Sequence, residues 1–418
     1  MKILPRIAAI GARSAWLRRN RSAFGQFTRA EQPHLFVDVS SIIWHDARTG
    51  IQRVVRAVSS ELARRSGNGF VFKPVFATHL HGYCHAPADF LAGIGQDWIA
   101  TPASVRPGDR FLGLDLAAHV LPRYRRQLAA WKAHGATIHL MVYDLLPMLR
   151  PDWFNASTAS NFRRWLRIVV NEADQAICIS DHVAKTLAQN IVGQARPRIA
   201  RMQMGADIRA SVPSTGISSE ISDLLDRLRF KPAVLMVGTI EPRKGYDVAL
   251  DAFDQLWRTY PSDAPDLVIV GKPGWKTSAL QQRLKMHPHR GSRLHWLTNV
   301  TDEALSSLYE GCAGVFIASR GEGFGLPLAE AAMFRRQVLA RDLPVFREQR
   351  LQHVSFFTDD SPAGLGPRLI ALAKAGAAGP APVTTPPSWS DCVEDLLRQI
   401  GLGDTHFHET EAPLRRAS

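Results

Sequence analysis

The chain has 418 residues, of which 45% are hydrophobic and 21% are charged, and its formal net charge at pH 7 is +13. This composition is typical of a globular protein, which excludes a disordered or fibrous chain, and the length allows two or three domains. No apolar run approaches the roughly 20 residues that span a bilayer, and the four widely spaced cysteines exclude a disulfide framework or a zinc site and indicate a reducing compartment.

Much of the positive charge lies in the first segment of the chain. Residues 1–30 contain seven Lys and Arg side chains and no acid, with a few large apolar residues among them but no continuous apolar core of a secretory signal. We expect residues 1–33 to form a basic leader. Two interpretations stay open, a flexible arm without a partner and a segment that binds an anionic membrane surface. No nucleic-acid-binding motif accompanies the charge, so nucleic acid is not an expected partner.

Strands and helices alternate through the first half of the remaining chain. Short apolar runs typical of buried strands occur at residues 34–43, 70–76, 110–114, 137–143 and 175–179. Between these runs, apolar residues recur at helical spacing, as in residues 50–64, 120–134 and 159–172. This alternation predicts an α/β domain over residues 34–212 with a parallel, doubly wound sheet. Ligands of such sheets lie beyond the carboxyl ends of the strands.

Two segments of this half follow predicted strands. The segment T-G-I-Q-R (residues 49–53) begins the first helix, and Y-D-L-L-P (residues 143–147) follows the fourth strand. Asp144 is suited to cap a turn before Pro147. A contact of Asp144 with a ligand is an equally open interpretation.

The second half repeats the alternation after a linker of turn-forming residues at 213–216. Further strands are expected at residues 234–237, 267–270, 294–297, 315–318 and 338–341. Helices are expected over residues 218–228, from 246 and from 301 or 302. We therefore expect a second α/β domain over residues 213–386, an amphipathic helix within residues 387–402 and a disordered tail at 403–418.

Arg243 and Lys244 lie in the turn between a predicted strand and the helix that begins at residue 246. A diphosphate carries about two negative charges and is bound by fixed cations together with N–H donors, both of which such a turn supplies. The segment is therefore a candidate diphosphate site. A solvated basic loop is the alternative interpretation.

Residues 314–334 combine a strand, a turn with three glycines and a helix that begins near Pro327. Free backbone N–H groups and the positive end of the helix dipole meet in this turn, which favours an anion. Glu322 and Glu330 flank the turn, and carboxylates beside an anion site suit sugar and ribose hydroxyls, which donate hydrogen bonds. The stretch predicts a site for a nucleotide sugar. An ordinary strand–turn–helix with two solvated glutamates is the alternative.

Together these segments resemble the glycosyltransferases of family 4, also called the glycosyl transferases group 1. The motifs that carry the resemblance are T-G-I-Q-R, Y-D-L-L-P, E-P-R-K-G (residues 241–245), G-K-P-G-W (271–275) and E-G-F-G-L-P-L-A-E (322–330). The resemblance extends over about residues 34–400, but R-R-Q stands at 335–337 where the family usually has G-x-P. It implies the GT-B fold, in which two Rossmann-like domains face each other across a cleft and close on the donor.

The resemblance also implies roles for individual residues. Arg243, Lys244 and Glu322 are expected to be catalytic, the two cations at the leaving diphosphate and the carboxylate at the sugar hydroxyls. Donor binding is expected from Gly50, Gly323, Phe324, Gly325, Leu326 and Glu330, with Glu330 at the ribose. Asp144 and Tyr143 are acceptor-side candidates, Tyr143 standing where the family commonly has histidine. No D-x-D pair stands at a plausible metal position, so neither a divalent metal nor another cofactor is expected.

The expected reaction transfers a hexose, with mannose or rhamnose favoured, from a GDP-, dTDP- or UDP-linked sugar to a hydroxyl of a lipid-linked or growing surface glycan. The anomeric configuration is retained by family analogy. The Y-D-L-L-P and P-V-F-R-E (residues 344–348) segments look most like those of bacterial mannosyl- and rhamnosyltransferases. The expected location is cytoplasmic, or peripheral on the inner face of the plasma membrane. A nucleotide-sugar epimerase of the same fold and a non-catalytic nucleotide-sugar-binding protein are the open alternatives.

Overall fold

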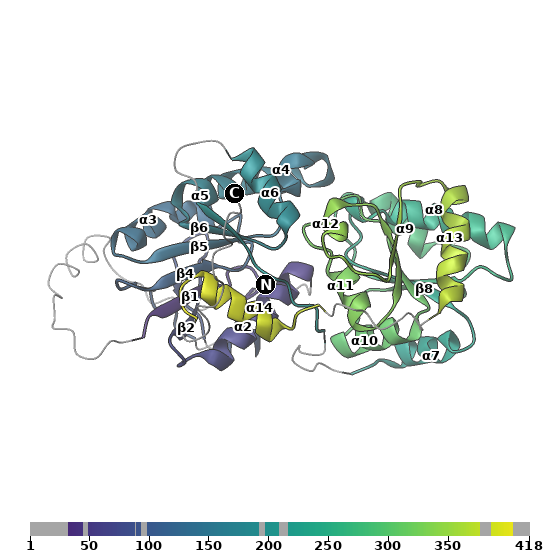
Figure 1. Ribbon diagram of the computed structural model, residues 1–418, viewed down its shortest axis with the longest axis horizontal. Coiled ribbons are helices and arrows are strands. Elements are labelled where there is room, and N and C mark those ends of the chain that lie inside the picture. Colours follow the sequence, from purple (N-terminus) through teal and green to yellow (C-terminus); the bar gives the residue numbers. More distant parts are fainter. Residues whose placement is uncertain are drawn as a thin grey trace, which may run out of the picture.

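The computed structural model describes residues 32–44, 49–87, 89–92, 98–191, 197–208, 216–376 and 386–403. Within these ranges the chain forms two α/β domains side by side, shown in Figure 1. We call residues 32–208 the N-domain and residues 216–376 the C-domain. The expected basic leader and the expected tail lie almost entirely outside the described residues, as do most of the two linkers.

The N-domain is built on a seven-stranded sheet with the strand order β3-β2-β1-β4-β5-β6-β7. Its strands are β1 (His34–Asp38), β2 (Val71–Phe76), β3 (Cys84–His85), β4 (Arg110–Gly113), β5 (Thr137–Val142), β6 (Gln175–Cys178) and β7 (Arg198–Arg201). Every neighbouring pair is parallel except β2 and β3. Its helices are α2 (Gly50–Arg65), α3 (Arg125–Ala133), α4 (Leu146–Leu149), α5 (Ala156–Glu172) and α6 (Asp181–Asn190), with 3-10 turns η1 (Phe90–Ala92), η2 (Leu121–Tyr124) and η3 (Pro151–Trp153).

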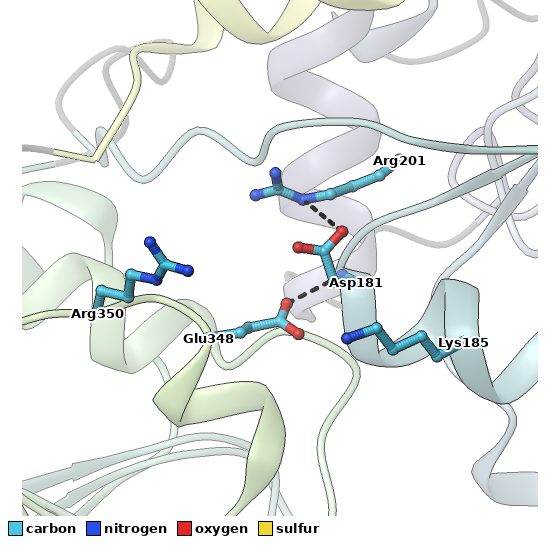
Figure 2. A pocket seen from close by; sticks show the side chains of 5 residues that line it. All are labelled: Asp181, Lys185, Arg201, Glu348 and Arg350. Carbon is cyan, nitrogen blue, oxygen red and sulfur yellow. Dashed lines mark hydrogen bonds and ion pairs between the residues drawn. The ribbon is translucent and has the colours of Figure 1, made fainter. Parts of the chain in front are cut away.

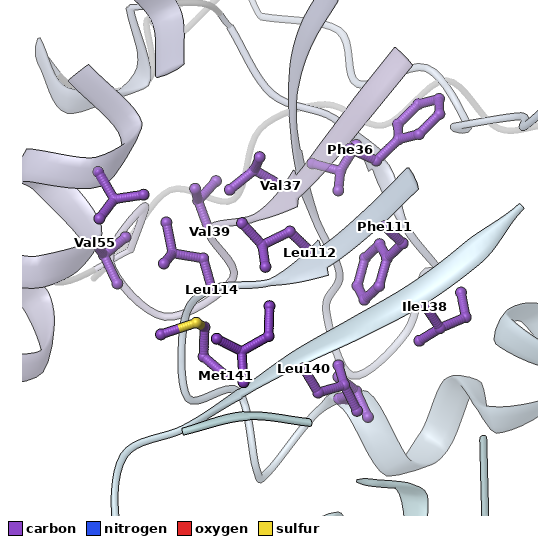
Figure 3. Packing of buried hydrophobic residues seen from close by; sticks show 14 of the residues in the cluster. Phe36, Val37, Val39, Val55, Phe111, Leu112, Leu114, Ile138, Leu140 and Met141 are labelled. Atoms are coloured by element: carbon purple, nitrogen blue, oxygen red, sulfur yellow. The ribbon is translucent and has the colours of Figure 1, made fainter. Parts of the chain in front are cut away.

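The order of the strands decides which face of the sheet each helix covers. The chain passes from β4 to β7 in one direction across the sheet, and right-handed crossovers therefore place α3, α5 and α6 in one layer. It passes from β1 to β2 in the opposite direction, which places α2 on the other face. Both faces are thus buried, and Figure 3 shows Val37 of β1, Leu112 of β4 and Leu140 of β5 in the resulting core.

The C-domain contains a six-stranded, all-parallel sheet with the order β10-β9-β8-β11-β12-β13. Its strands are β8 (Ala233–Val237), β9 (Asp266–Val270), β10 (Leu294–Leu297), β11 (Gly314–Ile317), β12 (Gln337–Arg341) and β13 (Val354–Phe357). Its helices are α7 (Ser219–Leu228), α8 (Tyr246–Thr259), α9 (Ser278–Lys285), α10 (Asp302–Gly311), α11 (Leu326–Met333), α12 (Pro344–Arg347) and α13 (Pro362–Ala375), with η4 (Pro242–Lys244).

Alternate residues of β8 enter two separate cores of the C-domain. Val234 and Met236 pack on one face of the sheet, and Ala233 and Leu235 on the other. A strand buried on both faces reads as a continuous apolar run, which is why this strand was predictable. The strand order reverses between β8 and β11, and between β1 and β4 in the N-domain. Such switch points are where open α/β sheets bind ligands.

The last helix, α14 (Trp389–Gln399), returns to the N-domain. It lies against α2, and its apolar side chains belong to the N-domain core. Trp389 also packs on Gly205, where an added Cβ would lie 2.6 Å from the indole, and its Nε1 donates to the carbonyl of Asp207 at 3.1 Å. The chain therefore crosses between the two domains twice.

Two local expectations need correction. The first strand ends at Asp38 and not at residue 43, because the Asp38 carboxylate accepts the N–H of Ser40 and turns the chain. At residues 335–337, Arg335 itself takes the left-handed conformation (φ 53°) in which a glycine is usual, so the turn forms without one.

Candidate functional site

A cavity of about 740 Å³ lies between the two domains, at the carboxyl ends of their strands. The N-domain contributes the start of α2 and the segment after β5, and the C-domain contributes the turns after β8, β9, β10 and β11. All of the candidate site residues line this one cavity: Gly50, Tyr143, Asp144, Arg243, Lys244, Glu322, Gly323, Phe324, Gly325, Leu326 and Glu330. Residues predicted from distant segments are thus brought together.

Two cations share one carboxylate in the C-domain wall. Arg243 Nη1 lies 2.7 Å from Glu322 Oε2, Lys244 Nζ lies 2.5 Å from Glu322 Oε1, and the hydroxyl of Ser319 donates to the same Oε1 at 2.7 Å. Burial disfavours the Glu322 carboxylate, but the charges of Lys244 and Arg243 outweigh burial and lower its pKa to about 2. The glutamate is therefore ionised at neutral pH and fixes both cations at the cavity.

The backbone explains why Arg243 and Lys244 lie there. They form the single turn η4, which begins at Pro242 and ends at Gly245 in the left-handed region (φ 69°). A Cβ at Gly245 would lie 2.2 Å from the carbonyl oxygen of Ala318, so only glycine allows the turn to pack against the end of β11. The turns after β8 and β11 are thereby held against each other.

The glycine-rich turn after β11 contacts the opposite domain. Gly325 caps α11 at φ 90°, and Leu326, which carries the first N–H group of this helix, lines the cavity. A Cβ at Gly323 would lie 1.9 Å from the carbonyl oxygen of Tyr143 in the N-domain. The absence of a side chain at residue 323 is therefore what allows the two domains to approach so closely.

Glu330 is only 1% exposed, and both of its carboxylate oxygens have partners. Arg53 Nη1, from α2 of the N-domain, donates to Oε1, and the hydroxyl of Tyr309 donates to Oε2 at 2.7 Å. Sequence reasoning selected neither Arg53 nor Tyr309 as a site residue. The signal for Arg53 was present, because it is the last residue of the T-G-I-Q-R motif.

Tyr143 and Asp144 are partly engaged in local structure. The hydroxyl of Tyr143 donates to the carbonyl of Leu114 at 2.6 Å, so it is bonded to the backbone of a neighbouring strand end. The carboxylate of Asp144 accepts the N–H of Leu146 at 3.0 Å, as a turn cap does. Burial raises the pKa of Asp144, and the nearby charge of Arg243 opposes this. Asp144 therefore both caps the turn before Leu146 and lines the cavity.

The turn after β1, at residues 39–44, is held by two buried carboxylates. Asp115 accepts the N–H groups of Ser41 and Ile42 at 2.7 Å each, and Asp38 accepts from the hydroxyls of Ser40 and Tyr83. Burial raises the pKa of Asp38 to about 7 and that of Asp115 to about 6.

Further contacts join the two domains at the rim of the cavity. In the G-K-P-G-W loop, Trp275 Nε1 donates to the carbonyl of Trp153 at 2.9 Å, and Lys276 Nζ donates to the carbonyl of Asp152 at 2.7 Å. The sequence left Trp275 without a role. Here it links the turn after β9 to the segment after β5, so this loop fixes the width of the cleft.

A second interdomain contact lies at the start of α6. The Glu348 carboxylate of the C-domain accepts the N–H groups of Asp181 at 3.1 Å and His182 at 2.7 Å. Figure 2 shows Glu348 and Asp181 in a smaller pocket of about 450 Å³, with Lys185, Arg201 and Arg350 around them. A carboxylate on the first N–H groups of a helix is favourable, so this contact stabilises the closed arrangement.

Two features are absent from the described residues. These residues contain no helix that is long and apolar enough to span a bilayer. They also contain no group of three or more His, Cys, Asp or Glu side chains arranged to hold a metal ion.

Comparisons with known proteins agree with one another. Residues 227–363 match the family model described as "Glycosyl transferases group 1". The chain is 35% identical over 396 residues to the serotype-specific mannosyltransferase WbdA of Escherichia coli, an alignment that covers 91% of this chain but only 46% of that protein. The chain thus spans about half the length of the curated relatives it matches. It also resembles the O-antigen chain mannosyltransferase RfbU of Salmonella typhimurium, with 24% identity over 60% of this chain and 62% of RfbU.

Solved structures show the same two-domain fold. Anabaena Alr3699/HepE, crystallised in complex with UDP and glucose, superposes with a TM-score of 0.57 and 14% identity over 89% of this chain and 100% of HepE. Sucrose-phosphate synthase from Thermosynechococcus elongatus superposes with a TM-score of 0.57 and 17% identity over 89% of this chain and 97% of that one.

Proposed function

Because the chain carries a domain of the glycosyl transferases group 1 family on the two-domain GT-B fold, we propose that it is a retaining glycosyltransferase. In this proposal it moves a hexose, with mannose favoured over rhamnose, from a nucleoside diphosphate sugar to a hydroxyl of a lipid-linked or growing surface glycan. The names of the relatives WbdA and RfbU support mannose. The observation that carries the proposal is the pairing of Arg243 and Lys244 on Glu322 within an interdomain cavity that Glu330 also lines.

Ion pairing in the cavity suggests how the diphosphate is bound. Its oxygens compete with Glu322 for Arg243 and Lys244, because all of these acceptors need the same two cations. An incoming diphosphate takes over part of this pairing, and the Glu322 carboxylate is then able to accept hydrogen bonds from sugar hydroxyls. The backbone N–H groups of residues 323–326, in the turn that leads into α11, add donors for the phosphate oxygens. The diphosphate and the sugar are thereby bound by one connected set of residues.

The proposed reaction breaks the bond between the anomeric carbon and the diphosphate oxygen and forms a bond from the same carbon to the acceptor oxygen. Arg243 and Lys244 neutralise the charge that develops on the leaving diphosphate. The leaving phosphate oxygen takes the proton of the acceptor hydroxyl, so the step needs no side-chain base. Because two fixed cations already face the diphosphate, we propose a reaction without a divalent metal. Glu330 is proposed to accept hydrogen bonds from the ribose diol.

Nucleotide sugars are expected to stabilise the protein against heat. A ligand that binds only the folded state at 100 times its Kd contributes about 2.7 kcal/mol, which raises the melting temperature by several degrees. The measurement is a thermal-shift screen of GDP-, UDP- and dTDP-linked hexoses, with free hexoses as controls. If no nucleotide sugar raises the melting temperature, the proposal is wrong. Incubating the best donor alone, and then with a glycolipid acceptor, separates a transferase from an epimerase or a non-catalytic binding protein.

One layer of the N-domain supports a peripheral association with an anionic membrane. Helices α3 and α5 are neighbours in this layer and, with η2, they carry exposed arginines. Among the described residues, no carboxylate lies within ion-pair distance of these side chains, namely Arg123, Arg126, Arg163, Arg164 and Arg167. Unpaired surface cations each contribute about 1 kcal/mol near an anionic bilayer. We therefore propose that this arginine face, together with the basic leader, holds the enzyme near a lipid-linked acceptor.

Removing three of these charges is expected to weaken vesicle binding about a hundredfold, at about 1 kcal/mol per residue. The variant combines Arg126→Gln, Arg163→Gln and Arg167→Gln, and its control removes the same charge from the C-domain through Arg258→Gln, Lys285→Gln and Arg335→Gln. Co-sedimentation with vesicles of phosphatidylglycerol and phosphatidylcholine is compared with phosphatidylcholine alone. If deletion of residues 1–30 abolishes binding while the triple variant binds normally, the leader and not the arginine face is the docking element.

A further inference from the structure

Among the described residues, Arg53 is the one cation of the N-domain that forms an ion pair with the carboxylate of Glu330. Its Nη1 donates to Glu330 Oε1, and its Nη2 lies 3.6 Å from Asp302 Oδ1 at the start of α10. Burial disfavours the Arg53 cation, but the charges of Glu330 and Asp302 outweigh burial and raise its pKa above the ordinary value. Arg53 is therefore a permanent cation that reaches from one domain to two acids of the other.

The hydrogen bonds of Glu330 leave part of its carboxylate unused. A carboxylate has about four lone-pair sites on two oxygens. Arg53 occupies one site on Oε1, and Tyr309 occupies one site on Oε2. One site on each oxygen remains for further donors, and Glu330 itself lines the interdomain cavity. Two hydroxyl groups on adjacent carbons match two adjacent acceptor oxygens.

Arg53 has an unused donor as well. Its Nε is buried and has no hydrogen-bond partner among the described residues. A buried N–H without an acceptor costs free energy, so its persistence in a cavity wall indicates a group that a ligand or a water completes. The side chain contacts two acids of the C-domain, Glu330 and Asp302.

We propose that Arg53 is a positioning residue for ribose recognition. From the N-domain it orients the Glu330 carboxylate so that the remaining lone pairs face the ribose diol. The ribose half of the donor site is thereby complete only when the two domains are closed. This inference rests on the proposed function, because it takes Glu330 to be the ribose acceptor.

A positioning role predicts an effect that depends on the ligand as well as on the residue. Arg53→Met removes the cation but keeps a long side chain, and it is expected to weaken binding of a ribonucleoside diphosphate about tenfold or more, because hydrogen bonds to charged groups are strong. It is expected to change binding of the 2′-deoxy analogue much less. Arg53→Lys, which keeps the charge, is expected to restore part of the difference. Arg64→Met on the same helix is the control, because Arg64 is exposed and, within the part of the chain that the structure describes, pairs with Glu61 alone.

The experiment is isothermal titration calorimetry of the full chain with GDP and 2′-deoxy-GDP, and with UDP and 2′-deoxy-UDP. Melting temperatures establish that each variant is folded. The inference is supported if the unaltered protein binds the ribonucleotide more tightly than its 2′-deoxy analogue and Arg53→Met abolishes most of that preference. If Arg53→Met weakens both members of a pair equally, or leaves the preference intact, the inference is overturned while the proposed function stands. If the unaltered protein binds no nucleoside diphosphate, the proposed function fails and the inference fails with it.

Discussion

Replacing Lys244 by methionine is expected to lower kcat about 10²- to 10³-fold, the size of the effect when one preorganised donor is removed from a developing negative charge. The side chain of Lys244 is only 11% exposed and its Nζ lies 2.5 Å from Glu322 Oε1, so the ammonium group is fixed before any diphosphate arrives. Methionine keeps the length of the side chain without its charge. Arg243 still pairs with Glu322, and the fold is therefore expected to survive.

The measurement is the rate of nucleoside diphosphate release at saturating donor and acceptor, with the melting temperature as a test of folding. Lys285→Met is the matched control, because Lys285 is an exposed lysine at the end of α9, away from the cavity lining. A Lys244→Met protein that is folded and turns over at a near-normal rate would contradict the assignment of this residue to the leaving group.

Adding a single methyl group at residue 323 is expected to force the domains apart. The Cβ of Gly323→Ala would lie 1.9 Å from the carbonyl oxygen of Tyr143, which is backbone and has no rotamer by which to move away. A misplacement of about 1 Å between catalytic groups costs about 100-fold in rate. We expect kcat/KM to fall by at least about that factor, because the groups on the two sides of the cleft no longer meet.

Small-angle X-ray scattering gives an independent readout, since a wedge between intact domains increases the radius of gyration without unfolding either one. Gly366→Ala is the control: this buried helical glycine has ordinary φ, and its added Cβ would meet Leu256 Cδ2 at 3.4 Å. If Gly323→Ala has the scattering profile and the activity of the unaltered protein, close approach at this glycine is not required for function.

Strands inside the two sheets were predictable from the sequence, and three of the four edge strands, β3, β7 and β13, were not. The predicted runs 234–237 and 267–270 form the inner strands β8 and β9, each of which begins one residue earlier than predicted, and the edge strand β10 (Leu294–Leu297) is the exception, with the predicted limits. In contrast, β7 (Arg198–Arg201) is an edge strand with no fully buried residue, so its sequence carries no apolar run. The expected helix 120–134 is divided into η2 and α3, the first of which contains Pro122. The proline at residue 122 accounts for this division of the helix.

The candidate site could be assembled because its residues follow strands whose carboxyl ends meet in the fold. Arg243, Lys244 and Glu322 all lie in turns directly after β8 and β11, which are neighbours in the sheet. The contact of Arg53 with Glu330 was not predictable in the same way, because 277 residues separate them and they lie on helices of different domains. A motif shows which residues face a cleft, but the ion pairs across it depend on how the two domains close.

The return of α14 to the N-domain has a consequence for how the protein is made. Trp389, Val393 and Leu396 of this helix are part of the N-domain core, whose buried members outside residues 389–402 come from residues 35–204. During synthesis, the first domain emerges with that part of its surface uncovered, and it stays so until the C-domain has been translated. Exposed apolar surface on a nascent chain favours aggregation. Ribosome-bound intermediates are therefore expected to engage chaperones until the final helix docks, so that the domain translated first is the last to mature.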